Sequence, residues 1–400
     1  MLKDICQSFN MASLAFRAAF FLSFVPSLVV VQASINITTI PLPVPEGPYS
    51  STIAVSELTD TSRANPFNGS SPYRQLVVSY YEPYLREDCA NIGEIDYMPA
   101  AVADWFNEND LPSPGLTTFS QVRFSDICLE APTTKPDTPL LIWTGGFYTS
   151  RLQYGAIAQA IASWGYRIVT IDHPYDAAIV EFPDGTIIYS AYASGAPTDA
   201  TSAYLQSIRV KDIEFVTGVF SKTSEVVGLY GHSLGASSQT AVLQADTTGK
   251  YVAGCNLDGK LQPPVGPTGL GNSSEIKKSY MFFAHDNHTI ASDPSWTAFW
   301  NTTDLLTPND PRVSLELSNT IHNSFTDLPL VIDVAGIRSV NESYFETLID
   351  TIYGPREIHD ITSYVREFFD WTLKGVESHP LLDASNSSFP DILFVRKAGY

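Results

Sequence analysis

The chain has 400 residues, of which 44% are hydrophobic, enough apolar material for one large domain or two smaller ones. Its 43 acidic residues outnumber 23 Lys and Arg residues and give a formal net charge of −20 at pH 7. This charge argues against nucleic acid and anionic membranes as electrostatic partners, because their phosphates would be repelled.

The N-terminal segment has the pattern of a secretory signal peptide. An apolar run over residues 18–31 follows Lys3 and Arg17 and leads into Val31-Gln32-Ala33. This small-residue ending is suited to cleavage after Ala33, so residues 1–33 are predicted to be a signal peptide and the protein to be secreted. A retained signal anchor is the alternative, and either Met1 or Met11 is the true start.

Acceptor sites for N-glycosylation and the cysteines agree with secretion. N-x-S/T sequons occur at Asn36, Asn68, Asn272, Asn287, Asn301, Asn341 and Asn386. Cys6 would be lost with the signal peptide. Cys89 and Cys128 lie in similar polar surroundings and Cys255 lies in an apolar run, so we expect a Cys89–Cys128 disulfide and a buried, free Cys255. Three free thiols are the alternative.

Residues 34–73 are rich in Pro, Ser and Thr, which predicts an irregular lead-in to one domain over residues 74–400. Apolar runs then alternate with segments of helical spacing. This alternation predicts an α/β fold, a mostly parallel sheet with helices on both faces. We expect strands at residues 75–81, 139–144, 166–172, 226–230, 251–257, 278–284 and 313–317. The strand at 313–317 is expected to be the last one in the chain. We expect helices at residues 154–164, 210–220, 236–243 and 357–373.

The segment Gly231-His232-Ser233-Leu234-Gly235 is the strongest chemical signal in the chain. It lies between an apolar strand pattern and a helix of small residues, which is the context of a G-x-S-x-G nucleophile elbow. Such a turn exposes the serine hydroxyl, so Ser233 is the predicted nucleophile of an acyl transfer.

A serine nucleophile needs a base, and in this kind of fold the acid and then the base follow it in the chain. His322 lies in a polar loop after the predicted last strand and is the expected base. His285 and His288 precede that strand. For the acid, Asp258 and Asp286 each follow a strand, and position alone slightly favours Asp286.

Two backbone N–H groups are expected to bind the oxyanion. One belongs to Leu234, the residue after the nucleophile, and the other to Phe147 in the loop after the strand at 139–144. A plain Gly145-Gly146 turn without that role is the alternative.

No cofactor or metal is expected. His285 and His288 are three residues apart and no further ligands are expected to cluster with them, and no P-loop or dinucleotide fingerprint is present. The aromatic residues Trp296, Phe299 and Trp300 have helical spacing. They fit an acyl pocket or a lipid-facing patch, although a core position is more usual.

Three segments together resemble the plasma and type II platelet-activating-factor acetylhydrolases, which are α/β-hydrolases. They are LIWTGGFYTSRLQYGAIAQAIASWGYRIVTIDH at 141–173, GLYGHSLGASS with GCNLDG, and IHNSFTDLP at 321–329. The resemblance places the acid at Asp258 rather than Asp286 and the base at His322, in a His-x-x-Phe-x-Asp pattern. The family usually has a His-Gly pair in the oxyanion loop, and this chain has Gly145-Gly146-Phe147.

The resemblance implies calcium-independent hydrolysis of the sn-2 acetyl or short acyl ester of a glycerophospholipid, with peripheral contact to a lipid surface. The residues alone support a serine carboxylester hydrolase. A general carboxylesterase or polyester hydrolase is the alternative enzyme. A binding protein on an inactive hydrolase fold is disfavoured, because Ser233, Asp258 and His322 are all present. The oligomeric state is left open.

Overall fold

Within the residues that this computed structural model describes, twelve strands join into one mixed sheet whose members reach from Ile40 to Ala398. The structure describes residues 38–400 except 68, 70, 113–115 and 272–276. The predicted signal peptide, residues 1–33, lies outside the described residues. The strands are β1 Ile40–Pro41, β2 Tyr49–Ala64, β3 Tyr73–Leu85, β4 Ile92–Asp96, β5 Val122–Cys128, β6 Leu140–Thr144, β7 Arg167–Asp172, β8 Ile179–Glu181, β9 Ile187–Tyr189, β10 Val227–His232, β11 Tyr251–Leu257, β12 Ser279–His285, β13 Arg312–Leu317 and β14 Ile392–Ala398.

The centre of the sheet is parallel and its two flanks are antiparallel. The order within the described residues is β1-β5-β2-β3-β7-β6-β10-β11-β12-β13-β14, with β4 beside β5 and a separate β8–β9 ribbon. Strands β7, β6, β10, β11, β12 and β13 run parallel, whereas β3 and β14 pair antiparallel with β7 and β13. The predicted mostly parallel α/β sheet is confirmed.

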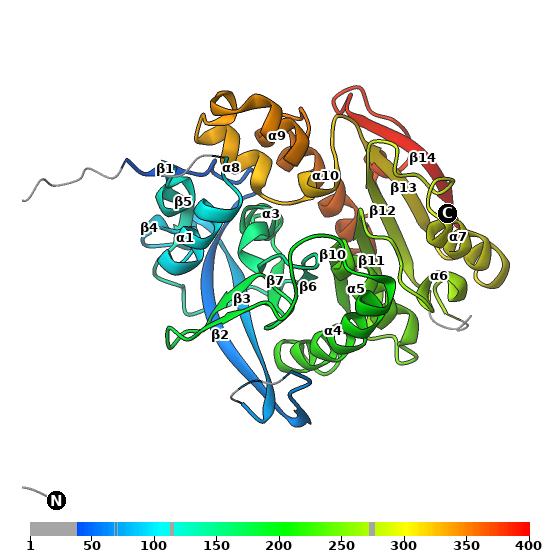
Figure 1. The fold of residues 1–400 in the computed structure, drawn as a ribbon. Coiled ribbons are helices and arrows are strands. Elements are labelled where there is room, and N and C mark those ends of the chain that lie inside the picture. The colour runs from blue at the N-terminus through cyan, green and yellow to red at the C-terminus, as the bar shows by residue number, and fades with distance from the viewer. Residues whose placement is uncertain (1–37, 68, 70, 113–115, 272–276) are drawn as a thin grey trace, which may run out of the picture. The chain divides into compact units, whose positions relative to one another are not determined.

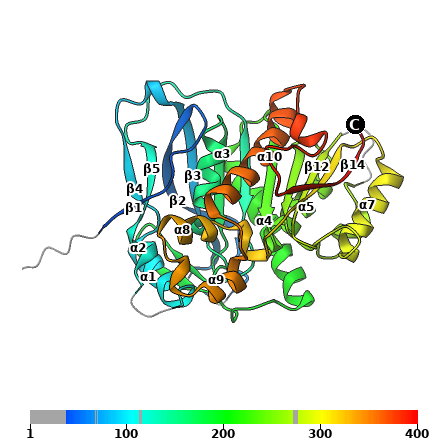
Figure 2. The ribbon, with the colours of Figure 1, turned by 90° about the horizontal axis from the view of Figure 1, so that it is seen from above.

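Helices cover both faces of the sheet (Figure 1, Figure 2). Helices α3 and α10 pack together on one face, and α4, α5 and α7 lie on the other. The helices are α1 Ala100–Asn109, α2 Thr118–Gln121, α3 Gly155–Ala162, α4 Asp199–Phe220, α5 Leu234–Ala245, α6 Val265–Thr268, α7 Pro294–Leu306, α8 Leu328–Val334, α9 Glu342–Ile349 and α10 Gly354–Lys374. Short 3₁₀ helices span Arg86–Asp88, Arg151–Tyr154, His322–Phe325, Arg338–Val340 and Pro380–Leu382.

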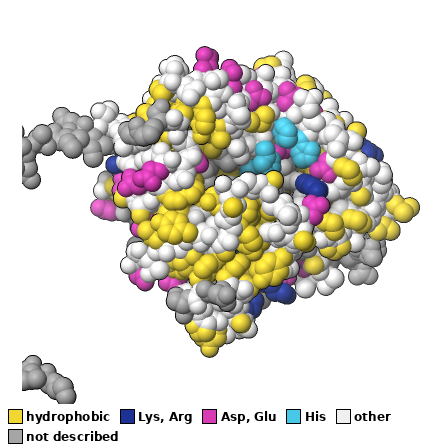
Figure 3. Space-filling model, in the orientation of Figure 1, with side chains coloured by type: hydrophobic (Ala, Val, Ile, Leu, Met, Phe, Trp, Pro, Cys, Tyr) yellow, Lys and Arg dark blue, Asp and Glu magenta, His cyan; other side chains and the backbone are white. Residues whose placement is uncertain are grey.

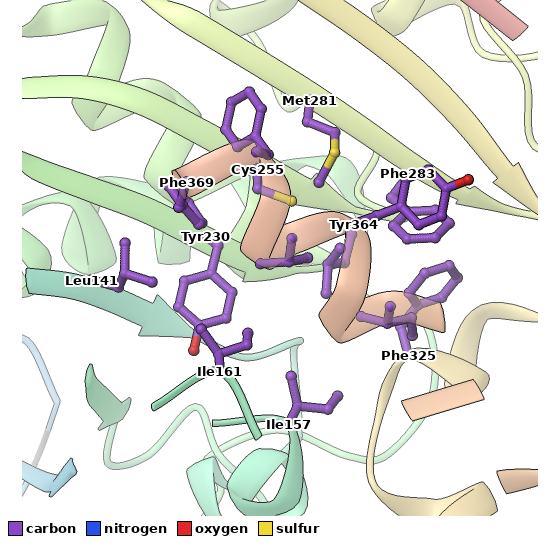
Figure 4. Close-up of a cluster of buried hydrophobic side chains, with 14 of the residues drawn as sticks. Leu141, Ile157, Ile161, Tyr230, Cys255, Met281, Phe283, Phe325, Tyr364 and Phe369 are labelled. Atoms are coloured by element: carbon purple, nitrogen blue, oxygen red, sulfur yellow. The ribbon is translucent and has the colours of Figure 1, made fainter. Parts of the chain in front are cut away.

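Alternating side chains of the central strands build two core layers, one on each face. Leu141 of β6 belongs to the layer with α3 and α10, whereas its neighbours Leu140 and Ile142 belong to the layer on the other face, where α4 and α5 contact β6. Figure 4 shows part of the first layer, where Tyr230 and Cys255 of the sheet lie in one cluster with Tyr364 and Phe369 of α10. Strands buried on both faces are continuous apolar runs, and this is why they were predictable.

Two predictions about the ends of the domain are wrong. The expected irregular lead-in at residues 34–73 contains the 16-residue strand β2, which pairs with β3 along almost its whole length. Most of its side chains are exposed or half-buried, so the apolar alternation that identifies a strand is weak. The strand at 313–317 is not the last, because β14 pairs with it after α10. The run Ile392-Leu393-Phe394-Val395 was the available signal.

The cysteines are arranged as predicted. Cys89 and Cys128 form a disulfide, and Cys255 is free and buried in β11. Burial raises the pKa of the Cys255 thiol well above its ordinary value, which keeps it protonated and inert. Among the described residues, no helix combines the length and the apolar character needed to cross a membrane.

The sequons fall into two groups. Asn36, Asn68 and Asn272 lie outside the described residues. Asn287, Asn301 and Asn341 are exposed, and Asn386 is half-buried. Asn341 also caps helix α9 by accepting a hydrogen bond from the N–H of Tyr344. The side chain that would carry a glycan is therefore the same one that caps the helix.

Candidate active site

The carboxyl ends of β6, β10 and β11 meet at one edge of the sheet and place the predicted site residues there. Gly231 is in register with Thr144 on one side and with Asn256 on the other. Ser233 and Asp258 therefore follow neighbouring strands directly. Loops beyond the carboxyl ends of parallel strands are where open α/β sheets bind ligands.

The turn at Ser233 is a strained strand-to-helix elbow. Ser233 has φ 55° and ψ −123°, and helix α5 begins at the next residue. A Cβ at Gly235 would lie 2.1 Å from the Thr144 carbonyl oxygen, and one at Gly231 would lie 2.8 Å from the same atom. Because β6 approaches this closely, only glycine fits at both positions.

Ser233, His322 and Asp258 form a hydrogen-bonded chain. The Ser233 hydroxyl lies 2.8 Å from His322 Nε2, and His322 Nδ1 lies 2.5 Å from Asp258 Oδ2. His322 is 46% exposed toward solvent, whereas the Asp258 side chain is fully buried. This is the geometry in which an imidazole takes the serine proton while a carboxylate fixes its tautomer.

The structure separates the two candidate acids. Asp258 faces the imidazole of His322, whereas the side chain of Asp286 interacts with Glu316 instead. Asp258 has φ 55°, and the Asn256 side chain clamps its turn by bonding the N–H and the carbonyl of Gly259 at 2.6 and 2.9 Å. Strain of this kind is held by its surroundings and is common at functional sites.

Asp258 also holds two histidines that the sequence reasoning left out of the site. Its Oδ1 accepts hydrogen bonds from Nδ1 of His285 at 2.7 Å and Nδ1 of His288 at 2.6 Å, and from the His285 backbone N–H at 3.1 Å. Burial alone would raise the pKa of Asp258, but the bonds from the three histidines and the charge of His322 hold it well below its ordinary value. The acid is therefore a fixed anion.

His288 is the best-anchored member of this cluster. Its Nε2 lies 3.0 Å from Asp293, and its ring stacks on Trp296 with centroids 4.2 Å apart. Burial lowers its pKa, but bonds to both carboxylates outweigh that effect and raise the pKa to about 9. His288 is thus a cation at neutral pH.

One expectation about these histidines is wrong. Asp258, His285 and His288 present ligand atoms within 4.8 Å of one another, so a further potential ligand does accompany the pair. The sequence signal that could have shown this is the position of the two histidines at and just after the end of β12, because β12 lies beside β11, the strand that Asp258 follows. In the structure, hydrogen bonds join these atoms to one another.

The predicted oxyanion donors lie beside the nucleophile. Leu234 and Phe147 line the same cavity as Ser233, and a Cβ on Gly146 would be 3.3 Å from Ser233 Cβ. Within the described residues, neither of these two backbone N–H groups has a protein acceptor. The N-terminus of α5 adds its positive dipole end. The loop can therefore serve a developing oxyanion without a His-Gly pair.

An arginine of helix α4 fixes the orientation of that loop. The Arg209 guanidinium donates to the carbonyls of Gly145 at 2.5 Å and Gly146 at 2.9 Å, and it is paired with Asp176. The Gly146 carbonyl and the Phe147 N–H belong to one trans peptide and point in opposite directions. Because the Gly146 carbonyl points toward Arg209, the Phe147 N–H points away from Arg209.

His232 connects the oxyanion loop with the loop that carries the base. Its Nε2 donates to the His322 carbonyl at 3.0 Å, so its Nδ1 accepts from the Tyr154 hydroxyl at 2.9 Å. Burial, with the nearby charge of His322, lowers the pKa of His232 to about 3, so the ring is neutral. Tyr154 in turn accepts from the Gly146 N–H at 3.1 Å.

Asp327, the last residue of the His-x-x-Phe-x-Asp pattern, has a positioning role. It accepts bonds from the Tyr97 hydroxyl at 2.8 Å and from the N–H groups of Ala156 and Ile157 at the start of α3. Burial raises its pKa to about 7 despite these bonds. The pattern thus ties the loop of His322 to the sheet through a helix N-terminus.

The predicted catalytic residues and oxyanion donors line one cavity of about 970 Å³. Ser233, Asp258 and His322 are on its wall, with Trp105, Phe147 and Tyr148 from α1 and the loop after β6. Figure 3 shows histidine side chains gathered at a hollow on this face. Asn287, a predicted glycosylation site, also lines the cavity.

The aromatic stripe on α7 has the core position. Trp296, Phe299 and Trp300 are fully buried in the layer between α7 and the sheet. They form neither an acyl pocket nor a lipid-facing patch. Trp296 still reaches the site, because its indole N–H bonds the Gly259 carbonyl at 2.8 Å beside Asp258.

Comparisons with known proteins place the chain in a family. No protein-family model matches it. The chain is 31% identical over 372 residues to a probable 1-alkyl-2-acetylglycerophosphocholine esterase of Arthroderma benhamiae, an alignment that covers 88% of this chain and 93% of the relative. Its fold is similar to a ferulic acid esterase from Streptomyces cinnamoneus, with a TM-score of 0.71, 25% identity, and coverage of 89% of this chain and 99% of that one. Two esterases thus share most of the chain's length, and the protein belongs to the platelet-activating-factor acetylhydrolase family of the α/β-hydrolases.

Proposed function

We propose that this protein is a serine esterase that hydrolyses the sn-2 acetyl or short acyl ester of a glycerophospholipid. The observation that carries the proposal is the chain of hydrogen bonds from Ser233 through His322 to Asp258. The activity for which the Arthroderma relative is named supplies the substrate class. The unoccupied N–H groups of Leu234 and Phe147 support the chemistry.

In the proposed reaction, the Ser233 oxygen attacks the ester carbonyl while His322 Nε2 takes its proton. Leu234 and Phe147 donate to the resulting oxyanion, and Asp258 stabilises the imidazolium. The imidazolium then gives its proton to the departing sn-2 oxygen, which releases the lysophospholipid and leaves an acyl-serine. Water, deprotonated by His322, attacks that ester and releases the carboxylic acid.

Activity on a panel of sn-2 esters tests this proposal. We expect Ser233→Ala to lower kcat by at least about 10³-fold, since the nucleophile is removed. Ser194→Ala is the matched control, because Ser194 lines the same cavity but bonds none of the three residues. Unchanged hydrolysis by Ser233→Ala would contradict the mechanism.

A general carboxylesterase is the second candidate. The volume of about 970 Å³ and the aromatic wall favour it, because they leave room for an aromatic acyl group. Rates on acetyl and long-acyl glycerophospholipids, compared with p-nitrophenyl and feruloyl esters, separate the two. A preference for feruloyl esters over sn-2 acetyl lipids would favour the second.

We also propose that the protein is secreted, with residues 1–33 removed, and that its exposed sequons carry glycans. The support is the N-terminal sequence pattern, the disulfide, and the exposure of Asn287, Asn301 and Asn341. N-terminal sequencing of protein from the culture medium, with peptide mapping after glycosidase treatment, tests both statements. An intact Met1 or Met11 in the mature protein would contradict the first.

A further inference from the structure

The wall of the active-site cavity carries a group of aromatic rings. Trp105 comes from α1, and Phe147 and Tyr148 from the loop after β6. The ring centroids of Trp105 and Tyr148 are 6.2 Å apart, and those of Phe147 and Tyr148 are 6.0 Å apart. All three side chains are half-buried, so part of each ring remains available to a ligand.

Next to these rings lies an acid without a cation. Asp110 directly follows α1 and lines the same cavity. Its carboxylate receives a hydrogen bond from Gln153 at 3.3 Å and forms no ion pair with a described residue. By contrast, the buried Asp176 and Asp212 are each paired with arginine. Burial raises the pKa of Asp110 to about 7, as expected for a carboxyl that lacks a countercharge.

The charge of the described cavity wall also favours a cationic ligand. Lys260 is its one Lys or Arg, and its ammonium group pairs with Asp199 at 3.0 Å. The wall contains three carboxylates, of which Asp199 is paired with Lys260 and Asp258 with the His288 cation, so Asp110 is the one that has no cation beside it among the described residues. A cation bound beside Asp110 would offset the desolvation of that carboxylate.

We propose that Trp105, Tyr148 and Asp110 form a subsite for the quaternary ammonium of the substrate's head group. A quaternary ammonium has no N–H and is recognised by aromatic faces together with an anion. The rings and the unpaired carboxylate supply both, and a neutral head group would leave the carboxylate uncompensated. This inference rests on the proposed function, because a choline-type head group belongs to the substrate class proposed above.

Binding of tetramethylammonium tests the subsite without any turnover. In a Ser233→Ala background, we expect its Kd, measured by isothermal titration calorimetry, to rise at least tenfold with Asp110→Asn or Trp105→Leu. Asp104→Asn is the matched control, because Asp104 is an exposed acid of the same helix outside the cavity wall. Sodium chloride at equal ionic strength corrects for screening. Equal Kd values for Asp110→Asn and Asp104→Asn would overturn the proposal.

The pH dependence of the same titration gives an independent readout. Because the cation binds the ionised carboxyl and the pKa of Asp110 is about 7, we expect binding to tighten about tenfold between pH 6 and pH 8. Gln153 and Tyr344, which approach Asp110, are both uncharged in this range. In Asp110→Asn this dependence should disappear. A dependence that persists in that variant would assign it to another group and count against the subsite.

Turnover then separates the subsite from the proposed function. We expect kcat/KM for an sn-2 acetyl phosphocholine to exceed that for its neutral 3,3-dimethylbutyl isostere by about tenfold. This ratio should approach 1 in Asp110→Asn, with each rate normalised to that variant's p-nitrophenyl acetate rate. Hydrolysis of both lipids at equal rates would overturn the subsite and leave the function. Tetramethylammonium binding that requires Asp110, without hydrolysis of either lipid, would overturn the function and leave the subsite.

Discussion

At the scale of single residues, Asp258 is the most heavily engaged group in the site. It accepts bonds from the imidazoles of His285, His288 and His322 and from a backbone N–H. A carboxylate with this many donors stays ionised and cannot rotate. Orientation of His322 therefore depends on two histidines that do not touch the nucleophile.

Exchange of the acid tests its assignment. We expect Asp258→Asn to lower kcat by roughly 10⁴-fold, because an amide cannot hold the required tautomer of His322. Asp286→Asn should change kcat less than about threefold, since its side chain interacts with Glu316. Steady-state kinetics on a p-nitrophenyl ester suffice. Equal losses in both variants would contradict the assignment.

Removal of the His288 cation should move the pH profile. His288, with a pKa of about 9, is charged below that pH and opposes protonation of His322 across Asp258. In His288→Gln we expect kcat to fall about tenfold and the acidic limb of kcat/KM to shift upward by up to about one pH unit. His359→Gln, in an exposed pair with Glu46, is the control. A lower kcat with an unmoved limb would indicate a merely structural role.

At the scale of elements, helix α4 holds the oxyanion loop in place through hydrogen bonds from Arg209. Arg209 is buried and holds both glycine carbonyls and Asp176. Lysine keeps the charge but cannot form this planar, forked set of bonds. The geometry of the Phe147 N–H is therefore expected to depend on arginine at this position.

Arg209→Lys should accordingly lower kcat by roughly 10–100-fold with little change in KM, because the loop acts in the transition state. Arg74→Lys is the matched control. Arg74 is equally buried and binds α4 through Asp212, but it does not touch the loop. The measurements are kcat, KM and the melting temperature of both variants. A similar loss of kcat in the control would show that the effect comes from the stability of α4.

Elements were predictable in proportion to their burial. The central strands are buried on both faces and read as apolar runs, and the elbow motif identified α5, whereas β2 has few buried residues and was missed. Strand β2 is stabilised by its long ladder with β3, a non-local contact that local sequence does not record.

At the scale of the whole molecule, the net charge of −20 and the buried acids both make the fold less stable as pH rises. Burial raises the pKa of Asp110 and of Asp327 to about 7. Such groups bind a proton in the folded state that the unfolded chain releases, so stability falls as pH rises from about 4 to 7. Hydrogen bonds from three histidines hold the pKa of Asp258 below the ordinary range, and the charge of Arg74 with the hydrogen bond from His173 does the same for Asp212, so their contribution is lost only in stronger acid.

We therefore expect the melting temperature to be highest between about pH 4 and 5 and to decrease by several degrees toward pH 8. The stabilising charge of His288, present below its unfolded pKa, is lost as pH rises through about 9, which extends the decline. Thermal unfolding across this range is the measurement. The slope between pH 4 and 7 should become smaller in Asp327→Asn, and a melting temperature that rises from pH 5 to 8 would contradict the account.

The sequence by itself determined the α/β layers, the elbow at Ser233 and the disulfide. These depend on local patterns, namely apolar runs, paired glycines and cysteines in polar surroundings. Only the tertiary structure decided how Asp258 meets three histidines, how Arg209 orients the oxyanion loop, and that Asp110 faces the nucleophile's cavity. Those contacts join segments up to hundreds of residues apart. Their geometry is fixed by strand register and helix packing, for which single-sequence patterns give no distance.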